Sequence, residues 1–145
     1  MKVSTRGRYA LRLMIDLAEH GPGEVVPLKD ISKRQDISTK YLEHIVTLLC
    51  KAGFLKSIRG SQGGYMLTKE PNKYTVGAIL RVTEGSLSPV TCIEERPNQC
   101  ERSNNCPTVD FWKGLNKVIN DYADKITLTD LVNRSEKSIQ NNYII

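Results

Sequence analysis

The sequence predicts a mainly α fold in which a winged helix-turn-helix domain is followed by a long C-terminal helix. Three observations predict it. A short helix, a tight turn and a capped helix are indicated between residues 28 and 52. Two strand-like runs flank a glycine-rich turn within residues 54–68. Charge is also divided, because residues 1–83 carry 14 basic and 7 acidic side chains, whereas residues 84–145 carry 7 and 9.

The first helix is expected from Ser4, a suitable N-cap, to His20, before the helix-breaking Gly21-Pro22-Gly23. Apolar side chains recur there at helical spacing, namely Leu11, Met14, Ile15 and Ala18. A short second helix is expected from Leu28 to Arg34. The three residues 35–37 then form a tight connection.

The third helix is expected from a Ser38 cap to Ala52, with Gly53 as its C-terminal cap. Its apolar stripe consists of Leu42, Ile45, Val46 and Leu49. This places five polar side chains outward: Thr39, Lys40, Glu43, His44 and Thr47. The hairpin that follows is interpreted as the wing.

These elements predict binding to a double-stranded DNA operator, because a basic domain releases counterions from DNA when it neutralises phosphates. The predicted DNA-binding residues of the third helix are Ser38, Thr39, Lys40, Tyr41, Glu43 and His44. Those of the wing are Arg59, Gly60, Ser61, Gln62 and Gly64. Glu43 is interpreted as a selectivity residue that accepts from a cytosine amino group. The alternatives are a salt bridge of Glu43 with Lys40 or Lys51 and, for the domain, a basic surface without a nucleic-acid partner.

A further short helix is expected from a Thr75 cap to Glu84, followed by a linker over residues 86–91. A long amphipathic helix is then expected to begin beside Cys106, with the apolar positions Val109, Trp112, Leu115, Ile119, Tyr122 and Ile126. We expect it to pair with its copy in a homodimer, although it could instead cover its own domain. The predicted units are a DNA-binding domain (1–83), a linker and cysteine loop (84–107), and a dimerisation helix with a mobile C-terminal tail, SIQNNYII (108–145).

Three cysteines, Cys92, Cys100 and Cys106, form a C-x7-C-x5-C run in a polar loop that has no core to fill. Three thiolates are one ligand short of the four that zinc or an iron–sulfur cluster takes, and no CxxC pair typical of zinc is present. A metal site is therefore favoured over a thiol redox switch or a chance cluster. Asp110 is a candidate fourth ligand, as are the loop acids Glu94, Glu95 and Glu101. Cys50 is interpreted as a core thiol.

Other functional classes find little support in the sequence. The N-terminus has no apolar signal region, and no stretch reaches the length of a membrane span, so a cytoplasmic protein is expected. No nucleophile–base pair, phosphate loop or paired-acid constellation indicates an enzyme.

Several segments together resemble one bacterial family. They are KVSTRGRYALRLMIDLA, ISTKYLEHIVTLLCKAGFLKSIRG, GSQGGYML, TVGAILRVTEG with its following SPV, and the three-cysteine loop leading to Trp112. Over nearly the whole chain they resemble the Rrf2 family of winged-helix transcription regulators. The resemblance implies homodimeric, sequence-specific DNA binding through the third helix and the wing. In the IscR- and NsrR-like members, three cysteines hold a [2Fe-2S] or [4Fe-4S] cluster that senses iron–sulfur, nitric oxide or redox status; CymR-like members instead regulate cysteine metabolism.

At two positions this chain has residues that differ from those of the cluster-binding members. The resemblance implies a fourth ligand either three residues after the last cysteine, where this chain has Val109, or near the start of the first helix, where it has Arg8. Neither residue is suited to bind iron. The sequence-based hypothesis is a repressor whose Cys92, Cys100 and Cys106 hold a [2Fe-2S] cluster. The alternative is a cluster-free regulator of cysteine or sulfur metabolism that uses a thiol switch, a protein or a metabolite.

Overall fold

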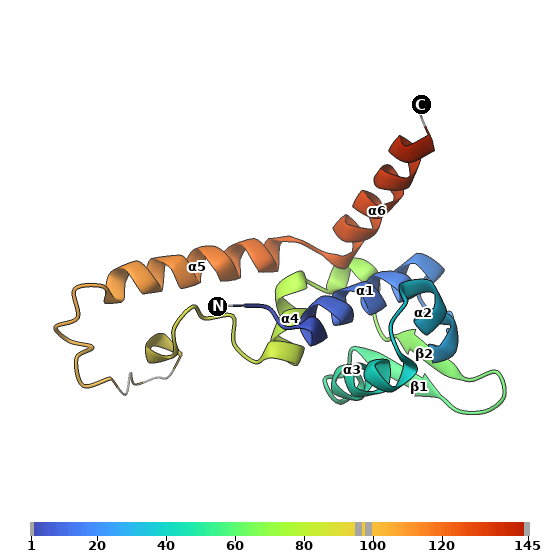
Figure 1. The fold of residues 1–145 in the computed structure, drawn as a ribbon, viewed down its shortest axis with the longest axis horizontal. Helices are drawn as coiled ribbons and strands as arrows, with labels where there is room; N and C mark the ends of the chain where they lie inside the picture. Colours follow the sequence, from blue (N-terminus) through green and yellow to red (C-terminus); the bar gives the residue numbers. More distant parts are fainter. Residues whose placement is uncertain (1, 95–96, 98–99, 144–145) are drawn as a thin grey trace.

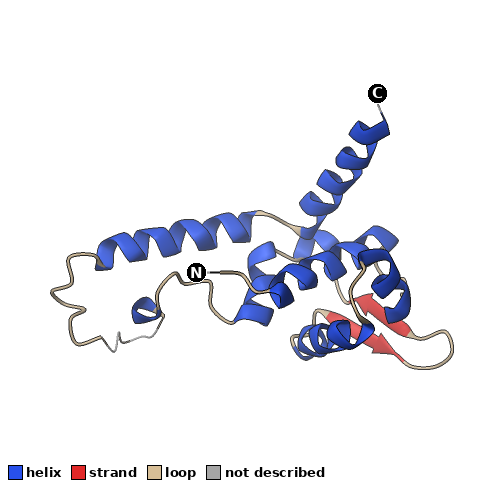
Figure 2. Cartoon of the chain, viewed as in Figure 1, coloured by secondary structure: helices blue, strands red, loops and turns tan. Residues whose placement is uncertain are grey.

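The computed structural model describes residues 2–94, 97 and 100–143 (Figures 1 and 2). The α-helices within these ranges are α1 (Thr5–His20), α2 (Leu28–Gln35), α3 (Thr39–Lys51), α4 (Val76–Glu84), α5 (Val109–Lys125) and α6 (Leu128–Tyr143). The strands are β1 (Leu55–Ile58) and β2 (Gly64–Leu67), and two short 3-10 helices are η1 (Pro71–Lys73) and η2 (Thr91–Ile93). The predicted fold class, mainly α with a winged helix-turn-helix, is confirmed.

Helix α1 has the predicted bounds, and the Ser4 hydroxyl accepts a hydrogen bond from the Gly7 amide at 3.3 Å. Its most buried apolar side chains are Ala10, Leu13, Met14 and Leu17, each at most 1% exposed. The expected stripe is therefore rotated, because Leu11, Ile15 and Ala18 lie half-buried at its edge.

Helices α2 and α3 meet at the predicted tight turn, where Asp36 adopts a left-handed conformation with φ 53°. Ser38 caps α3 by accepting from the Tyr41 amide at 3.2 Å. The predicted apolar stripe is confirmed, since Leu42, Ile45, Val46 and Leu49 are at most 1% exposed. The helix ends at Lys51, and Gly53 follows with a positive φ of 76°. Glycine tolerates this conformation because it lacks a Cβ atom.

The predicted hairpin is confirmed as an antiparallel pair in which Leu55 lies opposite Leu67. Both leucines are 3% exposed and belong to the core. Strand β2 also pairs with the segment before α2, because the backbone groups of Val26 and Tyr65 exchange two hydrogen bonds of 2.9 Å. The hairpin is therefore attached directly to the helix-turn-helix.

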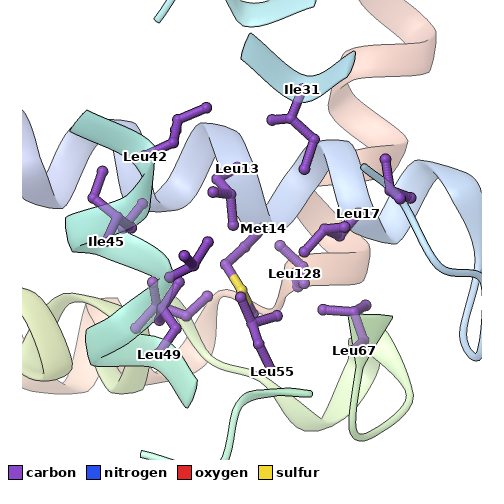
Figure 3. Close-up of a cluster of buried hydrophobic side chains, with 14 of the residues drawn as sticks. Leu13, Met14, Leu17, Ile31, Leu42, Ile45, Leu49, Leu55, Leu67 and Leu128 are labelled. Carbon is purple, nitrogen blue, oxygen red and sulfur yellow. The ribbon is translucent and has the colours of Figure 1, made fainter. Parts of the chain in front are cut away.

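One hydrophobic core unites these elements, and Figure 3 shows side chains from α1, α2, α3 and both strands pointing into it. Leu128, from the first turn of α6, also lies in this core and is fully buried. The main chain agrees with this packing. Val76 donates to Ile126 and Leu128 donates to Tyr74, both at 2.9 Å. The junction between α5 and α6 is thus attached directly to the segment that precedes α4.

The C-terminal region differs from the expectation in two places. The long helix begins at Val109 rather than beside Cys106, and it ends where Ile126 takes an extended conformation. A second helix, α6, then includes residues 138–143 of the expected tail, whereas residues 144 and 145 lie outside the described ranges.

The physical reason for α6 is a capping box at its start. The Thr127 amide donates to the Asp130 carboxylate at 2.9 Å, and the Asp130 amide donates to the Thr127 hydroxyl at 3.2 Å. The two residues thereby satisfy amides that have no partner in the first turn of a helix.

Within the described ranges, no helix combines the length and the apolar character that crossing a lipid bilayer requires.

Candidate nucleic-acid interface and cysteine loop

Helix α3 exposes the face that the sequence predicts for base reading. Ser38, Thr39, Lys40, Glu43 and His44 are all exposed. In Figure 1, α3 and the β-hairpin lie on the same side of the molecule, opposite α6. The structure therefore places the predicted helix and the predicted wing on one side.

Tyr41 is the exception on this helix, because it is half-buried and packs on α1. The Tyr41 and Tyr9 rings form a T-shaped pair with centroids 5.5 Å apart, and the Arg12 guanidinium lies 5.3 Å from the centroid of the Tyr9 ring. Arg12 also donates to the Gln35 side chain at 3.2 Å. Contacts from α1 thus fix the first turn of α3 as well as the end of α2.

A buried carboxylate that is not among the predicted site residues joins α1 to α2. Asp16 is 1% exposed and accepts hydrogen bonds from Arg34 at 2.8 and 3.0 Å and from Gln35 at 2.9 Å. Burial alone would raise the pKa of Asp16, but the hydrogen bonds and the positive charge of Arg34 outweigh it and lower the pKa. The signal in the sequence is an aspartate between apolar neighbours of one amphipathic helix. Asp16 holds the helix-turn-helix in position.

On the wing, Arg59, Gly60, Ser61 and Gln62 are exposed. Gly60 has a φ of 111°, a conformation that favours glycine. Gly64 lies in a different environment. A Cβ atom added there would be 2.3 Å from the Val26 carbonyl oxygen, so the missing side chain is required for the wing to pack on the segment before α2. A DNA contact from Gly64 stays a prediction.

Between the wing, α3 and the start of α2 lies a cleft of about 490 Å³. Its lining includes the predicted residues Thr39, Glu43 and Arg59. It also includes Lys29 and Ser57, which the sequence analysis does not select. In the sequence, only the alternation of residues along a strand indicates that Ser57 faces this cleft. Nothing in the sequence distinguishes Lys29 from the other lysines, because its place beside the wing depends on the fold.

The cysteine loop lies at the end of α5 that is remote from the wing (Figure 1). Cys92, on η2, and Cys106 are half-buried, whereas Cys100 is exposed. Among the residues that the structure describes, no three His, Cys, Asp or Glu side chains are grouped closely enough to hold a metal ion. The three thiols therefore share one loop without being arranged as a closed cage.

Cys106 differs from the other thiols in its hydrogen bonds. Its sulfur lies 3.3 Å from the Thr108 hydroxyl. This hydrogen bond, together with those from the backbone of Thr108 and Val109 and the charge of Arg102, lowers the pKa of the Cys106 thiol. Cys50 is the opposite case, because it packs against the core and burial raises its pKa.

The candidate fourth ligands are dispersed. Asp110 is exposed in the first turn of α5. Because the helix begins at Val109, Cys106 precedes it and the two residues do not share a face of one helix. Glu94 and Glu101 are exposed, and Glu95 lies outside the described residues.

The two positions at which the resemblance implies a fourth ligand hold residues that are not metal ligands. Val109 is the first residue of α5. Arg8 lies on α1, where its guanidinium donates to the Thr5 hydroxyl at 3.0 Å.

Comparison with known proteins identifies the family. Residues 3–134 match the Rrf2 family, which is described as an iron-dependent transcriptional regulator. The chain belongs to the Rrf2 family. It is 38% identical over 136 residues to the HTH-type transcriptional regulator IscR of Yersinia pseudotuberculosis, an alignment that covers 94% of this chain and 82% of that protein.

Two solved structures are similar to this Rrf2 protein over most of their length. IscR of T. potens is 40% identical with a TM-score of 0.75, and the match covers 95% of this chain and 90% of that one. CymR of B. subtilis, described as a global cysteine regulator, is 38% identical with a TM-score of 0.71, covering 92% and 98%. This Rrf2 protein is therefore a transcriptional regulator of the IscR type in sequence and fold, and the DNA-binding family implies DNA as its partner.

Proposed function

We propose that this protein is a sequence-specific DNA-binding repressor whose Cys92, Cys100 and Cys106 hold an iron–sulfur cluster of the [2Fe-2S] type. Its operator affinity would respond to cluster, redox or nitric oxide status. The observation that carries this proposal is the location of three cysteines on the loop between α4 and α5, two helices that also pack against each other.

The residues present fit the cluster in donor type. Cluster iron binds thiolates, and the lowered pKa of Cys106 favours its thiolate form. The cysteines do not form a finished cage, so the loop would have to close as the cluster binds. Metal binding can be coupled to folding in this way, and part of the binding free energy would then order the loop. When bound, the cluster would supply redox chemistry. The protein's contribution is to hold it at the foot of α5.

Helix α5 is firmly connected to the DNA-binding domain. Arg81 of α4 donates to both carboxylate oxygens of Asp124, at 2.8 and 2.9 Å, and to the Asn120 side chain at 2.6 Å. These bonds support a mechanism in which movement of the cysteine loop reaches the reading helix through α5 and α4. A switch of this kind requires the two cluster states to differ in DNA affinity.

A homodimer is part of the proposal. Phe111, Val118 and Tyr122 of α5 are 63%, 65% and 63% exposed, and such large apolar side chains gathered on one helix mark an interaction surface. An apolar groove of about 360 Å³, lined by residues such as Val3, Leu80 and Tyr122, adjoins this helix. Burial of these surfaces against a second copy would place two reading helices for a two-fold operator.

The cluster is tested by purifying the protein without oxygen, recording the visible spectrum and assaying iron and acid-labile sulfide. We expect a coloured protein, and we expect Cys106→Ala to lose the colour while Cys50→Ala keeps it. Cys50 is the matched control because it is a thiol that packs against the core. A colourless wild type that gains no cluster on reconstitution, yet binds its operator with full affinity, would overturn the cluster.

DNA binding is tested with duplexes selected from a random-sequence pool. Arg59→Ala should lower affinity for all sequences and flatten the salt dependence, as expected for a phosphate or minor-groove contact. Glu43→Ala should mainly relax base preference. Equal losses on selected and scrambled DNA for Glu43→Ala would contradict the role of Glu43.

The second candidate is a cluster-free regulator of cysteine or sulfur metabolism that uses a thiol switch or a co-effector. Val109 and Arg8 at the two expected ligand positions favour it, as does the similarity to CymR. A CymR of Staphylococcus aureus, 33% identical with a TM-score of 0.68, was solved in an oxidized form. An iron-free protein whose operator affinity changes on thiol oxidation would support this candidate.

A further inference from the structure

The cleft between the wing, α3 and α2 contains two cations and one acid in its lining. Lys29 comes from the first turn of α2, Arg59 follows β1, and Glu43 lies on the exposed face of α3. Lys29 and Arg59 are exposed, and within the described part of the chain neither makes an ion pair. Both positive charges are therefore available to an anion.

The shape of this cleft is fixed by backbone contacts. The two Val26–Tyr65 hydrogen bonds hold β2 against the residues that lead into α2. Gly64 allows this approach, since an added Cβ would also lie 2.7 Å from the Pro27 nitrogen. The position of Lys29 relative to the wing is thus determined by paired main chain rather than by a loose connection.

We propose that Lys29 is a further DNA-contacting residue, which binds a backbone phosphate of the operator strand that passes through this cleft. The proposal rests on the proposed DNA-binding function. Glu43 can read a base edge only if the neighbouring phosphates are held and neutralised, because its own carboxylate repels them. Lys29 on one wall and Arg59 on the other supply that neutralisation and set the register of the strand against α3.

The test is the salt dependence of DNA binding for Lys29→Ala, measured with a selected duplex and with a scrambled duplex of the same length. One lost phosphate contact should reduce the slope of log affinity against log salt by about 0.9 and weaken both complexes roughly fivefold to tenfold at about 0.1 M salt. Lys29→Arg should keep most of the affinity, because it retains the charge.

Lys73→Ala is the matched control. Lys73 is also an exposed lysine, but it belongs to η1, which packs against α6, the helix opposite the hairpin in Figure 1. Lys73→Ala changes the net charge by the same amount as Lys29→Ala. Comparing the two variants therefore separates a local phosphate contact from a general effect of charge.

A slope for Lys29→Ala equal to that of Lys73→Ala would overturn the proposal. If Arg59→Ala loses affinity as expected while Lys29→Ala does not, this inference alone fails. If the wild-type protein binds no DNA, both this inference and the proposed DNA-binding function fail.

Discussion

The DNA-binding domain and the region formed by α5 with the cysteine loop are stabilised in different ways. Helices α1–α4 and the hairpin share one core of leucine, isoleucine and methionine side chains that are fully buried or nearly so, including Leu13, Ile45 and Ile79. In contrast, the most buried residue of α5 is Ala123, and three large apolar side chains of this helix are exposed. The core of the first region is closed, with Leu128 of α6 contributing to it, whereas the second region has surface left to cover.

This difference indicates where the protein gains its response to a signal. The reading domain is held by one shared core, and α4 joins that core to α5. A helix with exposed apolar surface and a loop with an unclosed set of thiols can be stabilised by an added partner, such as a second chain or a cluster. Binding energy at the loop would therefore change the position of α5 before it disturbs the core.

The largest effect is expected just after α5, where the chain returns to the core of the DNA-binding domain. Leu128 follows α5 in sequence but belongs to the core of the DNA-binding domain. Leu128→Ala should therefore lower the free energy of unfolding by roughly 2–5 kcal/mol, the usual loss for a buried leucine.

Ile139→Ala is the control for Leu128→Ala, because Ile139 lies on the same helix but is 54% exposed. It should change the free energy of unfolding by less than about 0.5 kcal/mol, as surface substitutions do. Urea unfolding at one fixed protein concentration measures both variants. Similar values for the two would show that α6 does not begin in the core.

The features that the sequence predicts well are those set by neighbours in the chain. Ser4, Ser38 and Thr75 are recognisable as caps because each precedes its helix directly, and each accepts the expected amide hydrogen bond. The stripe of α3 is equally predictable, because its apolar residues at helical spacing mark the buried side, whereas in α1 the same spacing gave a rotated stripe.

The features that the sequence does not predict depend on residues far apart in the chain or on a competing local motif. The partners of Asp16 lie 18 and 19 residues away, so the apolar neighbours of Asp16 within α1 hint at burial but do not identify Arg34 and Gln35 as its partners. Apolar spacing continues through Ile126 and hides the end of α5, while the capping box from Thr127 to Asp130 starts a new helix.

The environment of Cys106 also differs from the expectation. Pro107 suits a first helical turn, which favours a helix that begins beside the cysteine. The helix instead begins at Val109, so Cys106 lies outside it and its sulfur contacts the Thr108 hydroxyl. Local pattern therefore predicts the helix but places its first residue two positions too early, at Pro107 rather than Val109.

A smaller effect, confined to the DNA-binding domain, is expected for Asp16→Asn. The loss of a carboxylate that accepts from Arg34 and Gln35 should cost about 2 kcal/mol of unfolding free energy. A fully enclosed pair would cost more, but the Arg34 side chain is 41% exposed. Asp121→Asn, which alters an exposed pair with Lys117, is the control and should have little effect.

The contribution of Asp16 should also depend on pH in a defined direction. Because the folded state lowers the pKa of Asp16, the unfolded state binds more protons, and the stabilisation is complete above the ordinary carboxyl pKa of about 4. It is lost as the pH falls through the folded pKa. The difference between wild type and Asp16→Asn should therefore be fully present at about pH 5 and shrink below about pH 4. A difference that stays constant to low pH would contradict this role.

The smallest effect tests whether α5 is attached to α4 as described. A Cβ atom on Gly77 would lie 2.0 Å from the Asp124 carboxylate, so Gly77→Ala must displace Asp124 from Arg81. We expect a loss of about 1 kcal/mol in the wild type, the size of an exposed ion pair. In an Asp124→Ala background the clash is gone, and the same substitution should stabilise by up to about 1 kcal/mol, because alanine favours helix over glycine.

This change of sign distinguishes a packed α5 from a loosely attached one, and a double-mutant cycle measures it by urea unfolding at one protein concentration. Asp124→Asn is the matched control, since its amide removes the charge but fills the same volume. Gly77→Ala should remain destabilising in that background if the steric contact with residue 124 is the cause. If Gly77→Ala has the same effect in all three backgrounds, α5 does not pack on α4 at this point. The cysteine loop would then be connected to the DNA-binding domain through the Ile126–Leu128 junction instead.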